Sequence, residues 1–179
     1  MKYRPLIILC HGQIDFDSDE NIVNVINKLR KDPSIGEIKT LVEYHFGKGP
    51  LSLVHFRKAK QDPHKIITLD QSSHHRPTIE TDLTQPLGTC GLTPPYFLVL
   101  SVFAPMTLEK NQGYQDNVSR LLASDGLFVI VVQHRVDTSY YRIHRQFYHE
   151  TFPQLKYHNG WRGNYWHPTG FMSFQTHIG

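Results

Sequence analysis

The sequence has few cysteines and no long apolar run. Its 179 residues contain two cysteines, Cys10 and Cys90, which cannot form a disulfide framework or a zinc cluster and are typical of a reducing compartment. The longest early apolar run, Pro5 to Cys10, is too short for the core of a signal peptide or for the roughly 20 residues of a membrane helix. These absences predict a protein of the cytoplasm or nucleus with no membrane partner.

An excess of charge of one sign is also absent. Nineteen lysines and arginines against 16 acids give a formal net charge of +3, which by itself does not indicate nucleic-acid or membrane binding. The histidine pairs His74-His75 and His144 with His149 have no carboxylate or cysteine at a metal-ligand spacing, so no metal site is expected. The length and the 39% hydrophobic content predict one folded domain over residues 1–179.

The sequence does contain an alternation of helix and strand patterns. Helical spacing predicts helices at about 18–32, 51–60, 114–122 and 139–152. Short apolar or β-branched runs predict strands at 38–44, 65–69, 78–83, 96–103, 127–132, 155–159 and 171–177. The alternation favours an α/β fold with a doubly wound, mostly parallel sheet that ends in a C-terminal antiparallel hairpin. Residues 1–37 are expected to be an N-terminal extension whose helix packs on this core.

Two features predict a nucleoside-type ligand at the carboxyl ends of the strands. Gly47 and Gly49 form a turn after the predicted strand 38–44, and Asp70 follows the predicted strand 65–69, 21 residues after Gly49. In such sheets a glycine turn lets backbone N–H groups approach the ligand, and an acid at this offset meets ribose hydroxyls. Either feature alone is common in ordinary turns, but together they favour a nucleoside site.

The order of the segments resembles that of the class I S-adenosylmethionine-dependent methyltransferases. The residues from Glu43 to Gly49 are similar to the family's acidic-x-Gly-x-Gly-x-Gly loop, with His45 in place of the first glycine. Five further segments resemble parts of this family's fold. Residues 66–70 are similar to its second strand with the ribose-binding acid, and residues 81–84 to its adenine-side segment. Residues 96–102 are similar to its fourth strand, residues 121–131 to its fifth strand with the preceding turn, and residues 147–174 to its terminal hairpin. The resemblance extends from Ile38 to the end of the chain.

This resemblance implies a Rossmann-like methyltransferase fold and S-adenosyl-L-methionine as the cofactor. The cofactor contacts that it implies are Glu43, His45, Gly47, Gly49, Asp70, Gln71, Asp82, Leu83 and Ser101. In it, Asp70 binds the ribose, the Asp82 carboxylate meets the exocyclic amine of adenine, and the Leu83 N–H meets a ring nitrogen. The residues alone also allow a salt bridge for Glu43 and a turn-capping role for Asp82.

Neither the methyl acceptor nor a catalytic base is identified by the sequence. His134, which follows the predicted strand 127–132, is a candidate base or substrate contact, or else a solvated loop residue. A second interpretation is a catalytically inactive protein with the methyltransferase fold that serves as a binding or scaffolding module. Two features favour it: His45 stands in the glycine loop, and residues 101–105 contain no carboxylate. Aminopropyl transfer to a polyamine is a further alternative. The sequence allows a small molecule, a protein or a nucleic acid as the methyl acceptor.

The C-terminal third is rich in aromatic residues and arginines. Such mixtures occur on nucleic-acid platforms, but a surface hairpin or an oligomer contact explains them equally well. The residues concerned are Arg142, Arg145, Trp161, Arg162, Tyr165 and Trp166.

Overall fold

The computed structural model describes residues 3–10, 18–33, 35–88, 91–133, 146, 150, 155–162 and 169–176. The strands are β1 (Leu6–Cys10), β2 (Ile66–Asp70), β3 (Ile79–Glu80), β4 (Tyr96–Val102), β5 (Leu122–Gln133), β6 (Leu155–Arg162) and β7 (Thr169–Thr176). The helices are α1 (Ser18–Leu29), α2 (Gly36–Phe46), α3 (Leu53–Ala59), the short 3-10 turn η1 (Ser73–His75), α4 (Met106–Glu109) and α5 (Gln112–Leu121).

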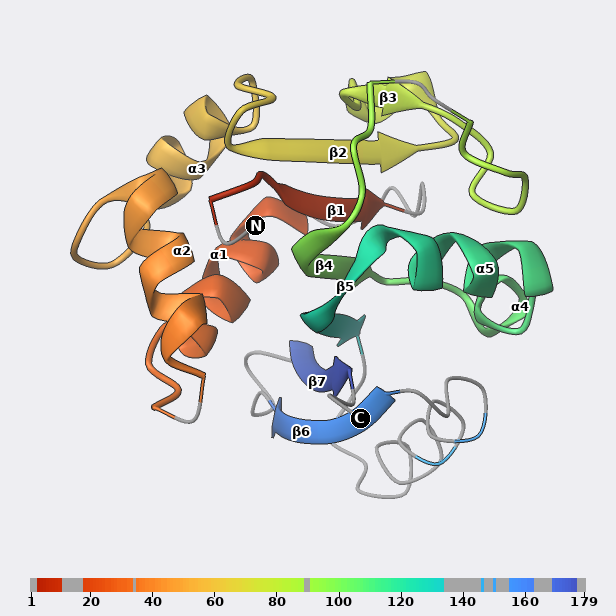
Figure 1. The fold of residues 1–179 in the computed structure, drawn as a ribbon. Coiled ribbons are helices and arrows are strands. Elements are labelled where there is room, and N and C mark those ends of the chain that lie inside the picture. The colour runs from red at the N-terminus through yellow and green to blue at the C-terminus, as the bar shows by residue number, and fades with distance from the viewer. Residues whose placement is uncertain are drawn as a thin grey trace.

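The strands form one sheet in the order β3-β2-β1-β4-β5-β7-β6 (Figure 1). The pairs from β3 to β5 are all parallel, so this part of the sheet has the order 3-2-1-4-5. Strand β7 pairs antiparallel with both β5 and β6. The prediction of a doubly wound α/β fold with a mostly parallel sheet is therefore confirmed.

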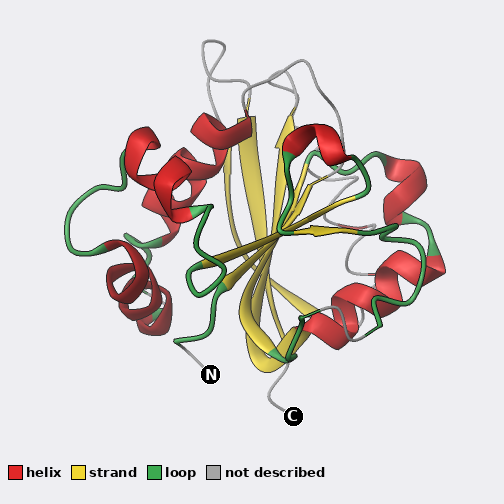
Figure 2. Cartoon of the chain, turned by 90° about the horizontal axis from the view of Figure 1, so that it is seen from above, coloured by secondary structure: helices red, strands yellow, loops and turns green. Residues whose placement is uncertain are grey.

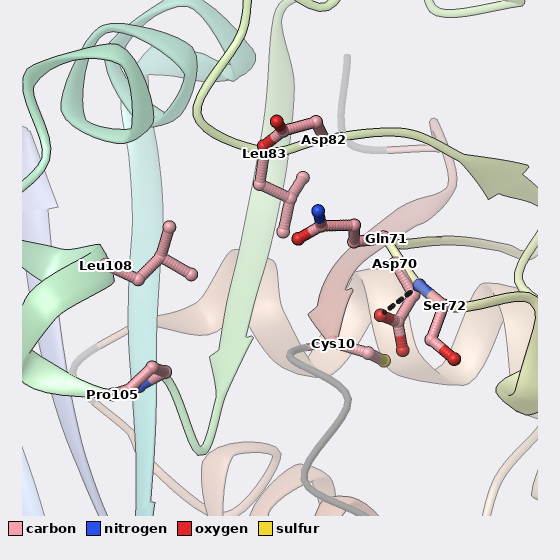
Figure 3. Close-up of a pocket in the computed structure, with 8 residues that line it drawn as sticks. All are labelled: Cys10, Asp70, Gln71, Ser72, Asp82, Leu83, Pro105 and Leu108. Atoms are coloured by element: carbon pink, nitrogen blue, oxygen red, sulfur yellow. Dashed lines mark hydrogen bonds between the residues drawn. The ribbon is translucent and has the colours of Figure 1, made fainter.

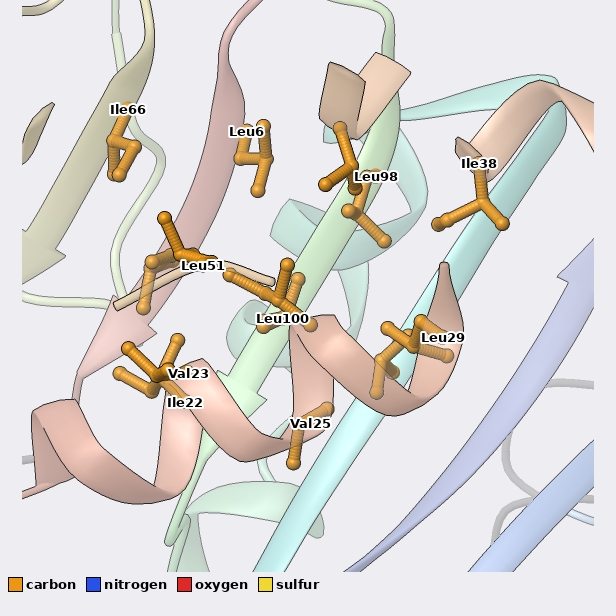
Figure 4. Packing of buried hydrophobic residues seen from close by; sticks show 14 of the residues in the cluster. Leu6, Ile22, Val23, Val25, Leu29, Ile38, Leu51, Ile66, Leu98 and Leu100 are labelled. Carbon is orange, nitrogen blue, oxygen red and sulfur yellow. The ribbon is translucent and has the colours of Figure 1, made fainter. Parts of the chain in front are cut away.

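Helices cover both faces of the sheet, with α1 to α3 on one side and α4 and α5 on the other (Figure 2). Strand β1 shows why both layers form. Leu6 and Ile8 pack in the cluster that contains α1 to α3, whereas Ile7 and Leu9 pack in the cluster that contains α5. Successive side chains of a strand point to opposite faces, so an uninterrupted apolar run suits a strand buried on both sides. Figure 4 shows Leu6 and Leu100 of the sheet together with Ile22 and Val25 of α1, all members of the first of these clusters.

The prediction of a first parallel strand at residues 38–44 is wrong, because these residues lie in helix α2. The buried positions of α2 recur at the spacing of one helix face and include Ile38, Leu41, Val42 and His45. The first strand is instead Leu6–Cys10, which lies between β2 and β4 in the middle of the sheet. Residues 1–37 therefore include a central strand of the core and are more than an extension packed on it.

Strand β5 begins earlier than the predicted range of 127–132. Its register against β4 shifts between two pairs, Tyr96 with Leu122 and Leu98 with Leu127. The turn that the sequence places before this strand, within residues 121–131, is therefore an irregularity inside a longer strand. A Cβ atom on Gly126 would lie 2.9 Å from the Ala123 carbonyl oxygen, which explains the glycine. Of the predicted helix 139–152, only Gln146 and Glu150 are described, and both are helical.

Candidate functional site

Four predicted cofactor residues lie on α2 and in the loop that follows it. Glu43 and His45 are in the last turns of the helix, Gly47 is its C-terminal cap, and Gly49 comes two residues later. Gly47 and Gly49 have φ angles of +82° and +93°, a conformation that glycine adopts without strain. These glycines end a helix, so the expectation that they form the turn after a parallel strand is wrong.

The contacts of this loop are with helix α1 and the residue that follows it. Arg30, directly after α1, forms an ion pair with Glu43 at 3.6 Å and donates a hydrogen bond to the Gly49 carbonyl. Asn27 of α1 donates to the Leu51 carbonyl at 2.9 Å and accepts from the Leu51 N–H at 2.8 Å. The salt-bridge alternative for Glu43 is thus what the structure shows.

His45 lies at the amino end of β1. Its Nε2 is 2.9 Å from the carbonyl oxygen of Arg4, the residue two positions before the strand. Burial lowers the pKa of the His45 imidazole, so the ring is neutral at pH 7. Since Asp70 is at the carboxyl end of β2, the structure does not bring His45, Glu43, Gly47 or Gly49 together with it.

A pocket of about 320 Å³ opens at the opposite edge, beyond the carboxyl ends of β1, β2 and β4 (Figure 3). The order of the strands reverses between β1 and β4, and ligands of open α/β sheets bind in the crevice at such a switch point. In Figure 3, Asp70 and Cys10 face Pro105 and Leu108 across the pocket. The lining residues are Cys10, Asp70, Gln71, Ser72, Asp82, Leu83, Pro105 and Leu108. Four of the predicted site residues, Asp70, Gln71, Asp82 and Leu83, are therefore brought together.

Asp70 is the last residue of β2, and its side chain has one satisfied and one unsatisfied oxygen. The residue is 1% exposed, and Oδ1 accepts a hydrogen bond from the Ser72 N–H at 3.0 Å. Oδ2 has no hydrogen-bond partner within the described part of the chain. A buried carboxylate oxygen without a donor is costly, so Oδ2 is suited to accept a hydrogen bond from a ligand hydroxyl.

Asp82 and Leu83 belong to the loop that follows β3. Oδ1 of Asp82 accepts from the Thr84 N–H at 2.9 Å and from the Thr84 hydroxyl at 2.7 Å, which is the turn-capping role that the sequence allowed. The hydrogen bonds from the Thr84 N–H and hydroxyl lower the pKa of the Asp82 carboxyl, so it carries a charge at neutral pH. The Leu83 side chain is 4% exposed and packs in the core beneath the loop.

The sequence interpretation missed Cys10, Ser72, Pro105 and Leu108. The usable signal for Cys10 was the apolar run from Leu6 to Cys10, bounded by Pro5 and by Gly12 in the sequence, which is the pattern of a short buried strand. Reading it as a strand puts Cys10 at the carboxyl end of β1. Gly12 is the one glycine among residues 11–17, which lie outside the described ranges.

Cys10 is a half-buried free thiol at the floor of the pocket. Burial raises the pKa of this thiol to about 12, and the nearby Asp70 carboxylate adds to the shift.

Because only the thiolate reacts, alkylation of Cys10 by iodoacetamide is expected to accelerate about tenfold per pH unit from pH 7 to pH 10. The measurement is peptide mass spectrometry on a Cys90→Ser background. The same protein unfolded in urea is the control, and its rate is expected to level off above about pH 9.5. A plateau near pH 9 in the folded protein would contradict this account of the pocket.

The two remaining predicted residues are not placed in the pocket. Ser101 is buried in β4, and its Oγ lies 2.5 Å from the Tyr114 hydroxyl of α5, so it joins the sheet to this helix. Burial raises the pKa of Tyr114, which keeps this hydroxyl protonated. His134 follows β5 in the sequence but lies outside the described residues.

Neither a membrane-spanning helix nor a metal-binding cluster is found within the described ranges. No helix there is both long and apolar enough to cross a bilayer. No group of three or more His, Cys, Asp or Glu side chains there is arranged to hold a metal ion.

Comparisons with known proteins give matches by structure and none by sequence. No protein-family model matches the chain, and no curated protein matches it. A SAM-dependent methyltransferase from Aquifex aeolicus matches 98% of this chain and 85% of its own, with a TM-score of 0.50 and 6% identity. The fibrillarin pre-rRNA processing protein of Methanococcus jannaschii matches over 98% of this chain and 68% of its own, with a TM-score of 0.51 and 10% identity.

A chain of a fibrillarin/Nop5p complex is similar in the same way. It covers 99% of this chain and 74% of its own, with a TM-score of 0.52 and 12% identity. Identities this low indicate a shared fold without a demonstrated shared activity. Together with the strand order 3-2-1-4-5, these matches show that the chain has the Rossmann-like fold of the class I SAM-dependent methyltransferases.

Proposed function

We propose that this protein binds S-adenosylmethionine in the pocket at the carboxyl ends of β1, β2 and β4 and transfers its methyl group to an acceptor. The observation that carries the proposal is the buried Oδ2 of Asp70, at the end of the second strand of a methyltransferase fold, which has no hydrogen-bond partner among the described residues. The similarity to a SAM-dependent methyltransferase from Aquifex aeolicus supports it.

The groups that line the pocket suit a nucleoside. Oδ2 of Asp70 would accept from the ribose hydroxyls, the charged Asp82 carboxylate would accept from the exocyclic amine, and the Leu83 N–H would donate to a ring nitrogen. Gln71 lies beside Asp70 at the same edge. A volume of about 320 Å³ lies at the lower end of the range typical of small-molecule pockets, roughly 300–1,000 Å³.

The cofactor supplies an electrophilic methyl group on a sulfonium centre. The ionisable side chains in the described lining are Cys10, Asp70 and Asp82, and the proposal uses both carboxylates for binding. The protein's contribution is thus mainly to orient the reactants, which alone lowers barriers substantially. His134 stays a candidate for contact with the acceptor, because it follows β5 and parallel strands present their carboxyl ends at this same edge.

The direct test is binding of S-adenosylhomocysteine to the wild-type protein by isothermal titration and thermal shift. At 100 times the dissociation constant, a ligand stabilises the folded state by about 2.7 kcal/mol, which for a chain of this size raises the melting temperature by roughly 5–10 °C. Free homocysteine at the same concentration is the control and should produce no shift. No heat and no shift at 1 mM S-adenosylhomocysteine would remove the proposal.

Binding without transfer is the second candidate function. It is favoured by the exit from β4, where residues 103–105 are Phe, Ala and Pro and offer no ionisable side chain to an acceptor. Radioactive methyl transfer from S-adenosylmethionine to a component of a cell extract, absent when the same extract is incubated without this protein, would decide for the enzyme. Tight cofactor binding with no transfer to extract components would favour the binding protein.

A further inference from the structure

The loop that carries Asp82 and Leu83 is held by a buried side chain of α5. Asn117 is 5% exposed, and its Nδ2 donates hydrogen bonds of 2.8 Å to the carbonyls of both Leu83 and Gln85. An amide with two donor hydrogens satisfies both carbonyls at once, which no apolar or hydroxyl side chain of similar size can do. The backbone on either side of Thr84 is therefore tied to one point on the helix.

A glycine of α5 makes the close approach of helix and loop possible. A Cβ atom on Gly113 would lie 1.9 Å from the Thr84 carbonyl oxygen, so any side chain there would push the loop away from the helix. The helix is itself anchored, since the Asn111 side chain caps its first turn through the Tyr114 N–H at 3.1 Å. The contact of Tyr114 with Ser101 then joins α5 to β4.

These ties leave two groups of the loop available to a ligand. The Leu83 N–H donates no hydrogen bond to an acceptor within the described ranges. Asp82 uses Oδ1 for both contacts with Thr84, which leaves Oδ2 as its other acceptor. Both residues line the pocket. One donor beside one acceptor is the pattern that complements the ring nitrogen and exocyclic amine of adenine.

We propose that Asn117 is a positioning residue for adenine recognition and that Gly113 permits its action. Asn117 holds the Asp82–Gln85 loop in the shape that pairs with adenine and rejects hypoxanthine, in which the ring N–H donates and the exocyclic oxygen accepts. This inference rests on the proposed binding of S-adenosylmethionine and adds to it the group that sets the selectivity for the base.

The test compares the dissociation constants of S-adenosylhomocysteine and its hypoxanthine analogue, S-inosylhomocysteine, by isothermal titration. Wild-type protein is expected to prefer the adenine ligand by about 100-fold. With hypoxanthine, the Leu83 N–H faces another N–H donor and the Asp82 carboxylate faces another oxygen acceptor, so neither can form a hydrogen bond. Asn117→Ala and Gly113→Ala are each expected to reduce this preference to about tenfold or less, chiefly by weakening the adenine ligand.

Two matched variants separate positioning from a general loss of stability. Asn27→Ala removes a comparable pair of contacts, those to Leu51, on the opposite side of the sheet. Gly36→Ala adds a methyl group near a helix N-terminus where nothing lies within 4 Å of the added atom. Both controls are expected to keep the 100-fold preference, even if Asn27→Ala lowers the melting temperature.

Each outcome has a definite meaning. A lower melting temperature for Asn117→Ala with an unchanged preference would reduce Asn117 to a structural role and overturn the inference. If Asn117→Ala does not fold, Gly113→Ala carries the same comparison. Equal binding of the two ligands by wild-type protein would overturn adenine recognition by this loop while leaving cofactor binding intact. Binding of neither ligand by wild-type protein is instead the failure of the proposed function.

Discussion

Asp70→Asn is expected to weaken the binding of S-adenosylhomocysteine by about 100-fold or more. The wild-type Oδ2 is buried and has no donor in the part of the chain that the structure describes. A ligand hydroxyl that reaches it therefore gains a hydrogen bond to a charged group, worth about 1.5–3 kcal/mol for each such bond. Asparagine presents an N–H₂ group or a neutral oxygen there instead. Isothermal titration of the two proteins side by side measures the difference.

The same substitution is expected to leave the folded state as stable as the wild type or more stable. Asparagine keeps an oxygen that accepts from the Ser72 N–H, and it removes a buried charge whose hydrogen bond within the described ranges comes from this backbone N–H and from no cation. Opposite signs for binding and stability distinguish loss of a ligand contact from damage to the fold.

Asp62→Asn is the matched control for this variant. Oδ1 of Asp62 accepts from the His64 N–H at 2.9 Å, the same two-residue turn that Asp70 makes with Ser72, but at the amino end of β2. Its effect on binding should be under about twofold. Equal affinity of the Asp70→Asn and wild-type proteins would rule out the ribose contact.

Ile8→Ala is expected to destabilise the folded protein by about 2–5 kcal/mol, because it empties a fully buried site on the central strand. Ile8 is 0% exposed, and its neighbours in the sheet are Thr68 of β2 and Leu100 of β4. Urea denaturation followed by circular dichroism measures the change. If the variant does not fold, Ile8→Val is expected to lose about 0.5–1.5 kcal/mol.

Val54→Ala is the control, since Val54 is 78% exposed on α3 and its truncation is expected to change stability by less than about 0.5 kcal/mol. A change of under 1 kcal/mol for Ile8→Ala would be incompatible with β1 as the middle strand. The result also discriminates between the two interpretations of residues 1–37, because a peripheral extension would tolerate the loss.

The candidate site was predictable from the sequence where a local pattern and its chemistry coincide. Asp70 ends an apolar β-branched run, and a polar residue that stops such a run lies at the edge of the sheet in any parallel arrangement. Asp82 and Leu83 stand at the end of the predicted strand 78–83, so their place at the same edge depends only on the direction of the strands. In the structure this strand ends at Glu80, and both residues lie in the loop that follows. Their roles toward a cofactor stay predictions.

The glycine loop was not predictable in this way. The apolar positions Ile38, Leu41 and Val42 have the spacing of one helix face, which the strand prediction for 38–44 did not use. The later glycines fit both a strand-to-helix turn and a helix C-cap. The contacts that decide it, from Arg30 to Gly49 and from Asn27 to Leu51, join residues about 20 positions apart. No window of the sequence contains them.

The sequence by itself determined the class of the fold and the position of Asp70, since alternating periodicities and the ends of apolar runs are local properties of the chain. Only the tertiary structure decided which strand lies at the centre, which loop faces the pocket, and that Asn117 holds the Asp82–Gln85 loop from more than 30 residues away. The physical reason is that packing between distant segments sets the strand order and the lining of the pocket. The free energy of that packing comes from buried apolar surface and from hydrogen bonds between distant residues, and the helix or strand propensity of a short segment includes neither.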